Sequence, residues 1–179
     1  MKPIKKALIL GDAMIPSSLF APAFEQYLSK YVESVESGEW ESDWGNLQYR
    51  RLEVEKKGPE IEKVPDLVYQ VIDTEILMGL FVPISSSVIK SLPKLRIVGV
   101  SRAGLENVNL EEATANNIMV FNVQGRNAEA VSDFVIGLML SEIRNIGRAF
   151  VSIKNGEWRK QFFNSSKIRK TARRENLHS

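Results

Sequence analysis

The sequence predicts a protein of the α/β class whose core is a parallel sheet of about five strands. Two observations support this prediction: short apolar runs typical of buried strands recur along the chain, and stretches of helical pattern separate them. Strands that alternate with helices in this way are typical of parallel βαβ units. A third observation, a long helical pattern after the last strand, predicts a further element outside the sheet.

The first predicted strand is buried and ends at the turn Gly11-Asp12, and Pro16 then provides a start for a helix. The acidic stretch Ser34–Gly45 is predicted to be a loop. Within the helical pattern over Pro59–Asp73, Pro65 is a candidate for the first residue of the helix. In order, these elements are a strand at Lys6–Leu10, a helix at Leu19–Tyr31, a strand at Leu47–Val54 and a helical pattern over Pro59–Asp73.

Three further strands follow, and Pro93 ends the short helix that lies between the first two of them. The predicted elements are strands at Ile76–Val82, Arg96–Val100 and Ile118–Phe121, with short helices at Ser85–Ser91 and Leu110–Asn116. Together the five strands favour a flavodoxin-like doubly wound sheet in the order 2-1-3-4-5.

The segment Ala128–Phe150 is predicted to be one uninterrupted helix, about 35 Å long at about 1.5 Å per residue. Its apolar residues cover a broad arc and leave only a narrow polar stripe, whereas a surface helix usually has one apolar stripe. A second domain or a second subunit is therefore expected against it. The alternative is a central helix of a compact domain.

Composition excludes several kinds of site. The 179 residues contain no cysteine and a single histidine, His178, which excludes thiolate metal sites, disulfides and an internal Ser-His-Asp triad. The longest run without a charged residue, Ile76–Ile89, has 14 residues, fewer than the roughly 20 that a membrane-spanning helix needs. We therefore expect no membrane segment and a cytoplasmic location.

The charge is uneven. Residues 159–179 carry seven basic residues and one acidic residue, whereas the rest of the chain carries 17 basic and 21 acidic residues. The end of this tail, KIRKTARRENLHS, contains no aromatic residue, and the tail has no recognisable nucleic-acid module. No nucleic-acid partner is therefore expected.

No glycine-rich dinucleotide or Walker pattern occurs in the sequence. Two segments remain at predicted strand ends, where ligands of doubly wound sheets bind. In the first, Gly104 allows a tight turn whose N–H groups can face a carboxylate, and Arg102 adds a positive charge. In the second, Gly125 breaks the strand and the side chain of Asn127 can cap the long helix. The alternative is that both glycines serve only as turns and Asn127 only as a cap.

These segments resemble the D-isomer-specific 2-hydroxyacid dehydrogenases. The residues that carry the resemblance are LPKLRIVGVSRAGLENVNLEEATANNIMVFNVQGRNAEAVSDFVIGLMLSEIRNI and then NGEWRKQFFN, about residues 92 to 164. The resemblance implies an active site between a substrate-binding domain and a second, dinucleotide-binding domain. It implies a substrate-binding domain at residues 1–126 and an interdomain and dimer-building helix region at 127–158. The basic tail at 159–179 is expected to be poorly ordered.

The resemblance also implies roles for single residues. The backbone N–H groups at Ala103 and Gly104 would bind the substrate carboxylate, Asn127 would lie beside the substrate, and Ile84 and Ser85 would border the same cleft. With Arg102, these are the predicted substrate-binding residues. The implied partners are a small 2-hydroxy or 2-oxo acid and a second copy of the chain, bound through the helix at 128–150.

The family's dinucleotide fingerprint and its catalytic Arg, Glu and His would come after the NGEWRKQFFN segment, and none of them is present in this sequence. The cofactor NAD is thus implied by the resemblance alone. We expect the sequence to represent the substrate-binding half of an NAD(P)-dependent dehydrogenase, cut short and inactive by itself. The alternatives are a non-catalytic binding or dimerisation module and a nucleic-acid-binding protein that uses the basic tail.

Overall fold

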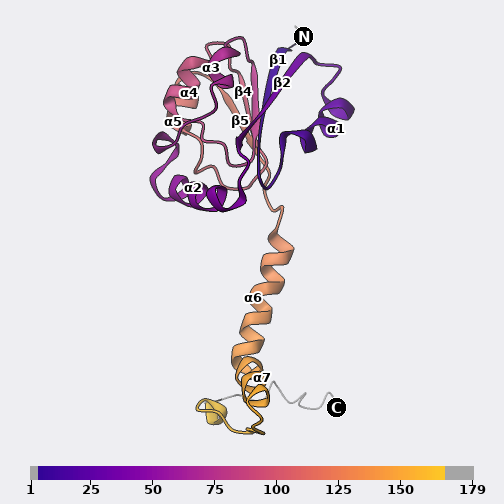
Figure 1. Cartoon of the computed structure of the whole chain (residues 1–179), viewed down its shortest axis with the longest axis vertical. Coiled ribbons are helices and arrows are strands. Elements are labelled where there is room, and N and C mark those ends of the chain that lie inside the picture. The colour runs from indigo at the N-terminus through magenta and orange to yellow at the C-terminus, as the bar shows by residue number, and fades with distance from the viewer. Residues whose placement is uncertain (1–3, 168–179) are drawn as a thin grey trace, which may run out of the picture. The chain divides into compact units, whose positions relative to one another are not determined.

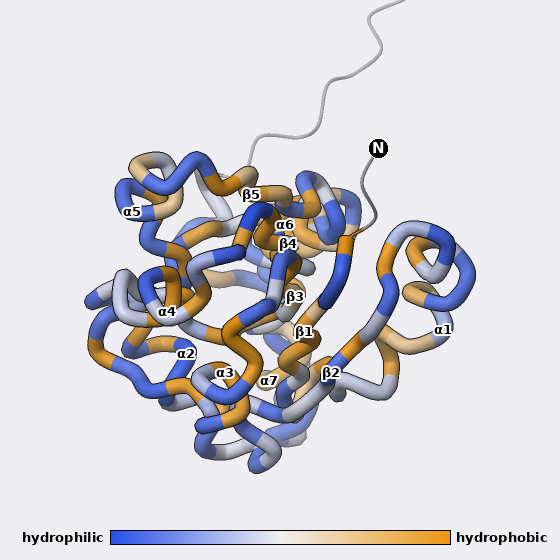
Figure 2. Tube along the Cα trace, turned by 90° about the horizontal axis from the view of Figure 1, so that it is seen from above, coloured by the Kyte–Doolittle hydropathy of each residue, from blue (hydrophilic) through white to orange (hydrophobic). Residues whose placement is uncertain are grey.

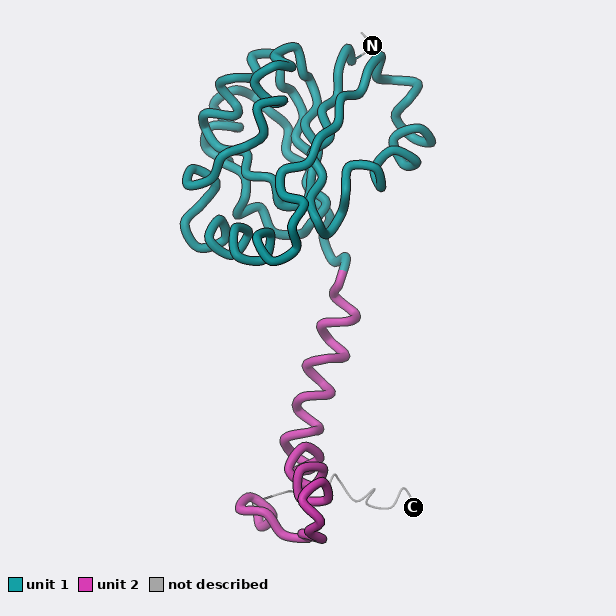
Figure 3. Tube along the Cα trace, viewed as in Figure 1, with its two compact units in different colours: residues 1–126 teal, residues 127–179 magenta. Residues whose placement is uncertain are grey.

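The computed structural model describes residues 4–167 (Figure 1). The chain divides into two compact units, Met1–Arg126 and Asn127–Ser179 (Figure 3). His178, the single histidine, and most of the basic tail that is predicted to be poorly ordered lie outside the described residues.

The first unit contains a five-stranded, fully parallel sheet in the order β2-β1-β3-β4-β5. Figure 2 shows the strands following one another in this order. The α/β class, the parallel sheet and its strand order are therefore confirmed. The strands are β1 (Ile4–Asp12), β2 (Val32–Glu41), β3 (Ile76–Gly79), β4 (Ile97–Val100) and β5 (Met119–Asn122).

Helices connect these strands. Three of them begin with a side-chain cap: Asp43 accepts a hydrogen bond from Asn46 N, Ser85 accepts one from Val88 N, and Asn109 accepts one from Glu112 N. The helices are α1 (Ser17–Tyr27), α2 (Trp44–Lys57), α3 (Leu67–Gln70), α4 (Ser86–Ser91) and α5 (Leu110–Ala115), with a 3-10 turn η1 at Pro59–Ile61.

The position predicted for the second strand is wrong. Leu47–Val54 lies within helix α2, where Leu47 and Val54, seven residues apart, are both buried on one face. Asp43 caps this helix by accepting a hydrogen bond from Asn46 N at 2.8 Å. The true second strand occupies most of the acidic stretch predicted to be a loop, because an edge strand can expose charged side chains while pairing through its backbone.

The helical pattern over Pro59–Asp73 forms only the 3-10 turn η1 and the single turn α3. The other predicted elements lie within a few residues of the observed ones.

Helices cover the two faces of the sheet unequally. Helices α2 to α5 pack on one face over the main core, and α1 alone packs on the other face, against β1 and β2 (Figure 1). On that second face the side chains of Met119 and Phe121 are 51% and 59% exposed. The loops at the carboxyl ends of the strands are thus held mainly by the core that α2 to α5 cover.

The second unit contains α6 (Ala128–Ile143), α7 (Ile146–Lys154) and a 3-10 turn, η2, at Ser165–Lys167. The prediction of one uninterrupted helix over Ala128–Phe150 is wrong, because the chain breaks at Asn145, whose φ is 57°. Asparagine adopts this left-handed conformation more readily than most residues. The predicted side-chain cap at Asn127 is also absent, since its side chain makes no hydrogen bond at the start of α6.

Within the second unit, helix α6 buries none of its own residues, so its broad apolar arc is exposed there. None of the described helices combines the length and the apolar character needed to cross a membrane.

Candidate functional site

Two of the predicted site segments meet at the carboxyl ends of β3 and β4. Ile84 N donates to Asn107 O at 2.7 Å, and Asn109 N donates to Ile84 O at 2.9 Å. Ile84 and Val108 thereby form an isolated parallel bridge. The loop that carries Ile84 and Ser85 is therefore joined to the loop that carries Arg102, Ala103 and Gly104.

The side chain of Asn107 strengthens this connection. It is 1% exposed, and its Nδ2 donates to Val82 O at 2.8 Å and to Leu80 O at 3.5 Å. Sequence reasoning missed this residue, although it lies in the ENVN motif of the resemblance. A single side chain thus connects the loop after β4 to the backbone that follows β3.

Gly104 is not among the described glycines with positive φ, so a left-handed turn is not what this position requires. The carboxylate of Glu106 lies against its α carbon: a Cβ added at Gly104 would come within 2.2 Å of Glu106 Oε2. The neighbouring Ala103 carbonyl accepts a hydrogen bond from Asn122 Nδ2 at 2.6 Å. The loop after β4 thus already has a carboxylate on its surface at Gly104.

Arg102 is part of an ionic cluster. Its Nη2 lies 2.9 Å from Glu55 Oε1 and 3.2 Å from Glu106 Oε2. The guanidinium lies over the Phe81 ring, 5.0 Å from its centroid, and Arg51 lies over the same ring at 5.3 Å. Arg51 also pairs with Glu55 at 3.5 Å. Sequence reasoning found Arg102 but missed its partners on α2, which are distant along the chain and carried no local signal.

Ile84 and Ser85 lie beside this loop with little exposure to solvent. Ile84 is fully buried and Ser85 is 2% exposed. The Ser85 hydroxyl accepts a hydrogen bond from Val88 N at 3.4 Å and lies 2.8 Å from Ser87 Oγ, so it serves as the cap of α4. Asn127 belongs to the second unit, where its side chain is exposed.

Asp12 supports the same end of the sheet from β1. Its carboxylate is 1% exposed and accepts hydrogen bonds from Met14 N at 2.9 Å, Ile15 N at 3.0 Å and Phe81 N at 3.3 Å. Burial raises the pKa of the Asp12 carboxyl above its ordinary value of 3.8. Asp12 thereby holds Phe81, the ring beneath both arginines, at the end of β1.

The turn after β1 does not fit the diphosphate of a dinucleotide. In doubly wound sheets, the turn after the first strand usually offers its phosphate site at the start of a helix. Here the carboxylate of Glu39 occupies that position and accepts a hydrogen bond from Ser17 N at 2.9 Å. A Cβ at Gly11 would also lie 2.4 Å from Glu39 Oε2. A negative group at this position disfavours a diphosphate.

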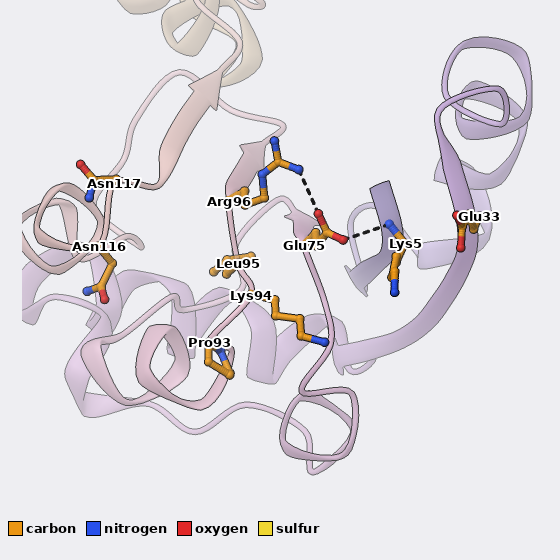
Figure 4. A pocket seen from close by; sticks show the side chains of 9 residues that line it. All are labelled: Lys5, Glu33, Glu75, Pro93, Lys94, Leu95, Arg96, Asn116 and Asn117. Atoms are coloured by element: carbon orange, nitrogen blue, oxygen red, sulfur yellow. Dashed lines mark hydrogen bonds and ion pairs between the residues drawn. The ribbon is translucent and has the colours of Figure 1, made fainter. Parts of the chain in front are cut away.

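A cavity of about 710 Å³ lies at the amino ends of the strands (Figure 4). Its lining includes Lys5, Lys94 and Arg96, and the carboxylate of Glu75 accepts hydrogen bonds from Lys5 N at 3.1 Å and Arg96 Nη1 at 3.0 Å. Ligands of doubly wound sheets bind at the carboxyl ends instead. We therefore place the candidate site at the loops after β3 and β4.

Comparison with known proteins identifies relatives of this chain. Residues 28–177 match the sequence model of the D-isomer specific 2-hydroxyacid dehydrogenase catalytic domain. Over 80 residues, 44% of this chain, the sequence is 38% identical to D-3-phosphoglycerate dehydrogenase of Methanocaldococcus jannaschii. Over 136 residues, 75% of this chain, it is 29% identical to glyoxylate reductase of Korarchaeum cryptofilum.

The fold also matches solved structures. A crystal structure of D-lactate dehydrogenase from Aquifex aeolicus, complexed with NAD and lactic acid, covers 89% of this chain with a TM-score of 0.57 and 14% sequence identity. The aligned regions account for 40% of that structure, 15% of the M. jannaschii protein and 36% of the K. cryptofilum protein. The chain therefore spans well under half the length of these relatives.

Proposed function

Since this chain belongs to the D-isomer specific 2-hydroxyacid dehydrogenase family, we propose that residues 1–126 are the substrate-binding part of an NAD(P)-dependent enzyme of that family. The proposed reaction of the whole enzyme transfers a hydride between a nicotinamide and C2 of a small 2-hydroxy or 2-oxo acid. The observation that carries the proposal is the pair of joined loops after β3 and β4, at the sheet edge where such folds bind ligands.

The proposed contacts to the acid come from the loop after β4. The N–H groups of Ala103 and Gly104 would donate hydrogen bonds to its carboxylate, and Arg102 would add a positive charge. Asn127 would lie beside the acid, and the loop at Ile84 and Ser85 would border it. Because Asn107 fixes the backbone around these groups, they would bind the acid without a large ordering cost.

The turn after β1 does not fit a diphosphate, and we assign none of the residues 4–167 to a dinucleotide site. The proposal is therefore that the 179 residues bind the acid but do not turn it over by themselves. Calorimetric titration of the pure chain with pyruvate tests binding, and NADH fluorescence with a steady-state reduction assay tests turnover. Binding of pyruvate without turnover is the expected result. No heat of binding at any pyruvate concentration would contradict the substrate-binding role, and robust turnover would contradict the assigned absence of a cofactor site.

A second proposed role is self-association through the second unit. Phe134, Leu138 and Met139 of α6 are between 54% and 65% exposed in the second unit, and exposed apolar patches of this kind mark contact surfaces. We therefore propose a homodimer that uses the helix region 128–150. Sedimentation equilibrium should give twice the monomer mass of 20.2 kDa, and a monomer at micromolar concentration would contradict this role.

A further inference from the structure

The cavity at the amino ends of the strands is large enough for a small organic molecule. Its volume of about 710 Å³ falls within the range of about 300–1,000 Å³ that is typical of small-molecule sites. Five separate segments contribute to its lining: β1, β2, the residue before β3, residues 93–96 at the start of β4, and the turn after α5 (Figure 4). The loops after β3 and β4 lie at the opposite ends of the strands, so the proposed acid does not fill this cavity.

Glu75 holds the wall of the cavity together. Its carbonyl accepts hydrogen bonds from Arg96 N at 2.9 Å and Ile97 N at 3.1 Å, and its own N–H donates to Lys6 O at 2.9 Å. Its carboxylate accepts a hydrogen bond from Lys5 N at 3.1 Å and pairs with Arg96 Nη1 at 3.0 Å. These two contacts lower the pKa of the Glu75 carboxyl below its ordinary value of 4.5. Glu75 therefore fixes the starts of β1, β3 and β4, and its negative charge is already paired.

Two lysines beside this frame keep their charges free. Among the described residues, the Nζ atoms of Lys5 and Lys94 form no ion pair, and Figure 4 shows the Lys94 side chain extending toward Lys5. The carboxylate of Asp73, on which Lys94 acts only at longer range, pairs with Lys6 at 3.1 Å. The second acid of the lining, Glu33, is exposed on β2. Two free ammonium groups thus share the cavity with one free carboxylate, which leaves one positive charge uncompensated.

Further hydrogen-bond donors line the same space. Arg96 uses Nη1 for its ion pair, and its side chain is 52% exposed, so the remaining guanidinium N–H groups face solvent. Asn117 lines the cavity on the side away from Lys5 (Figure 4), and its side-chain amide makes no hydrogen bond to another described residue. Lysine and arginine are the usual partners of phosphate, whereas an amide can bind a neutral hydroxyl. The cavity therefore has a cationic end and a neutral polar end.

We propose that this cavity binds a small organic phosphate, with the phosphate between Lys5, Lys94 and Arg96 and the organic body toward Asn117. A phosphate monoester carries about 1.5–2 negative charges at pH 7, so it balances two ammonium groups better than a monocarboxylic acid does. The organic body fills the space that a free phosphate ion would leave empty. This inference does not depend on the proposed function, since it concerns other residues of the first unit.

The test is calorimetric titration of the full chain at constant ionic strength with ribose 5-phosphate, inorganic phosphate and ribose. Ribose 5-phosphate should bind about tenfold more tightly than inorganic phosphate, and ribose, which lacks the charge, should give no heat of binding. Backbone amide NMR shifts locate the site. Addition of ribose 5-phosphate should produce the largest changes at Lys94, Arg96 and Asn117.

Single substitutions at exposed positions separate the contributions. Lys5→Gln and Lys94→Gln should each weaken binding of ribose 5-phosphate by about threefold to tenfold, because each removes one positive charge from the cationic end. Glu33→Gln removes the competing carboxylate and should strengthen that binding by about threefold. Lys63→Gln is the matched control, since Lys63 is also exposed but does not line the cavity, and it should leave the affinity unchanged.

Three results would overturn the inference. Absence of binding by both phosphate compounds would exclude the site. Equal affinity for inorganic phosphate and ribose 5-phosphate would show that the organic body makes no contact. Equal weakening by Lys63→Gln and by the two cavity lysine variants would attribute binding to overall charge. None of these results bears on binding of the acid at the loops after β3 and β4, so the two proposals fail separately.

Discussion

Replacing Asn107 with alanine tests whether one side chain holds the two candidate loops together. The substitution removes a hydrogen bond of 2.8 Å to Val82 O and a weaker one of 3.5 Å to Leu80 O, both in a region that solvent does not reach. Loss of a buried partner costs about 1–3 kcal/mol. Because only the first of the two bonds is short, we expect a loss of about 2 kcal/mol in the free energy of unfolding.

Urea unfolding followed by tryptophan fluorescence measures this loss, since Trp40 is 6% exposed and lies in the same unit. The matched control is Asn116→Ala. Asn116 also donates Nδ2 to a backbone carbonyl, Glu112 O at 2.8 Å, but its side chain is exposed. The control should cost less than about 0.5 kcal/mol.

Equal stability losses for the two asparagine variants would refute the reasoning, because burial would then not decide the cost. Asn107→Ala should also weaken binding of the acid, since Ala103 and Gly104 lie in the loop that Asn107 anchors. Unchanged acid binding in a clearly destabilised Asn107→Ala chain would show that the anchoring has no part in recognition.

Three further predictions follow from single contacts. The Asp12 carboxyl has a raised pKa, so it binds protons more tightly in the folded chain than in the unfolded chain. The stability of the wild type relative to Asp12→Asn should therefore fall as the pH rises from 3.8 through the folded-state pKa. A stability difference in urea unfolding that does not change with pH would contradict this. Gly11→Ala would place a Cβ 2.0 Å from Ser17 N and should lower the free energy of unfolding by about 1–3 kcal/mol, as measured by thermal unfolding. Gly137→Ala meets open space in a helix and should be neutral or stabilising. Similar effects of the two substitutions would show that the turn after β1 can relax. Leu138→Asp should convert the dimer to a monomer in sedimentation experiments without changing unfolding of the first unit, and a persistent dimer would place the contact elsewhere.

The sequence was sufficient to predict the parallel sheet and its strand order, because β1, β3 and β4 are buried strands whose apolar runs are unambiguous. It was insufficient for β2. That strand buries only Val32 and Trp40 and exposes its glutamates, so its composition resembles that of a loop. The neighbouring segment 47–54 looked strand-like because its apolar residues alternate moderately with polar ones, whereas in the helix it forms only Leu47 and Val54 are buried.

The spacing of apolar residues also could not predict the break between α6 and α7. The apolar positions continue through Asn145 with helical spacing, and only a backbone conformation with a φ of 57° ends the first helix. A lone asparagine is compatible with either a helix interior or a break, so periodicity alone cannot separate these outcomes.

At the candidate site, the glycine loop and Arg102 could be predicted because they follow a clear strand. Their partners could not, since Arg51 and Glu55 lie on a helix that sequence reasoning took for a strand. Glu106 was adjacent in sequence, but only the structure places its carboxylate on Gly104 and Arg102. Arg102 and Glu55 are 47 positions apart in the sequence, and an ion pair over such a distance depends on the packed fold and leaves no local sequence pattern.

The most direct measurement is the change in backbone amide NMR shifts when D-lactate is added to the ¹⁵N-labelled chain. The account predicts that the largest changes occur at Ala103 and Gly104, with smaller changes at Ser85. Changes centred on Lys5, Lys94 and Arg96 at the amino ends of the strands, or no changes at saturating ligand, would contradict it.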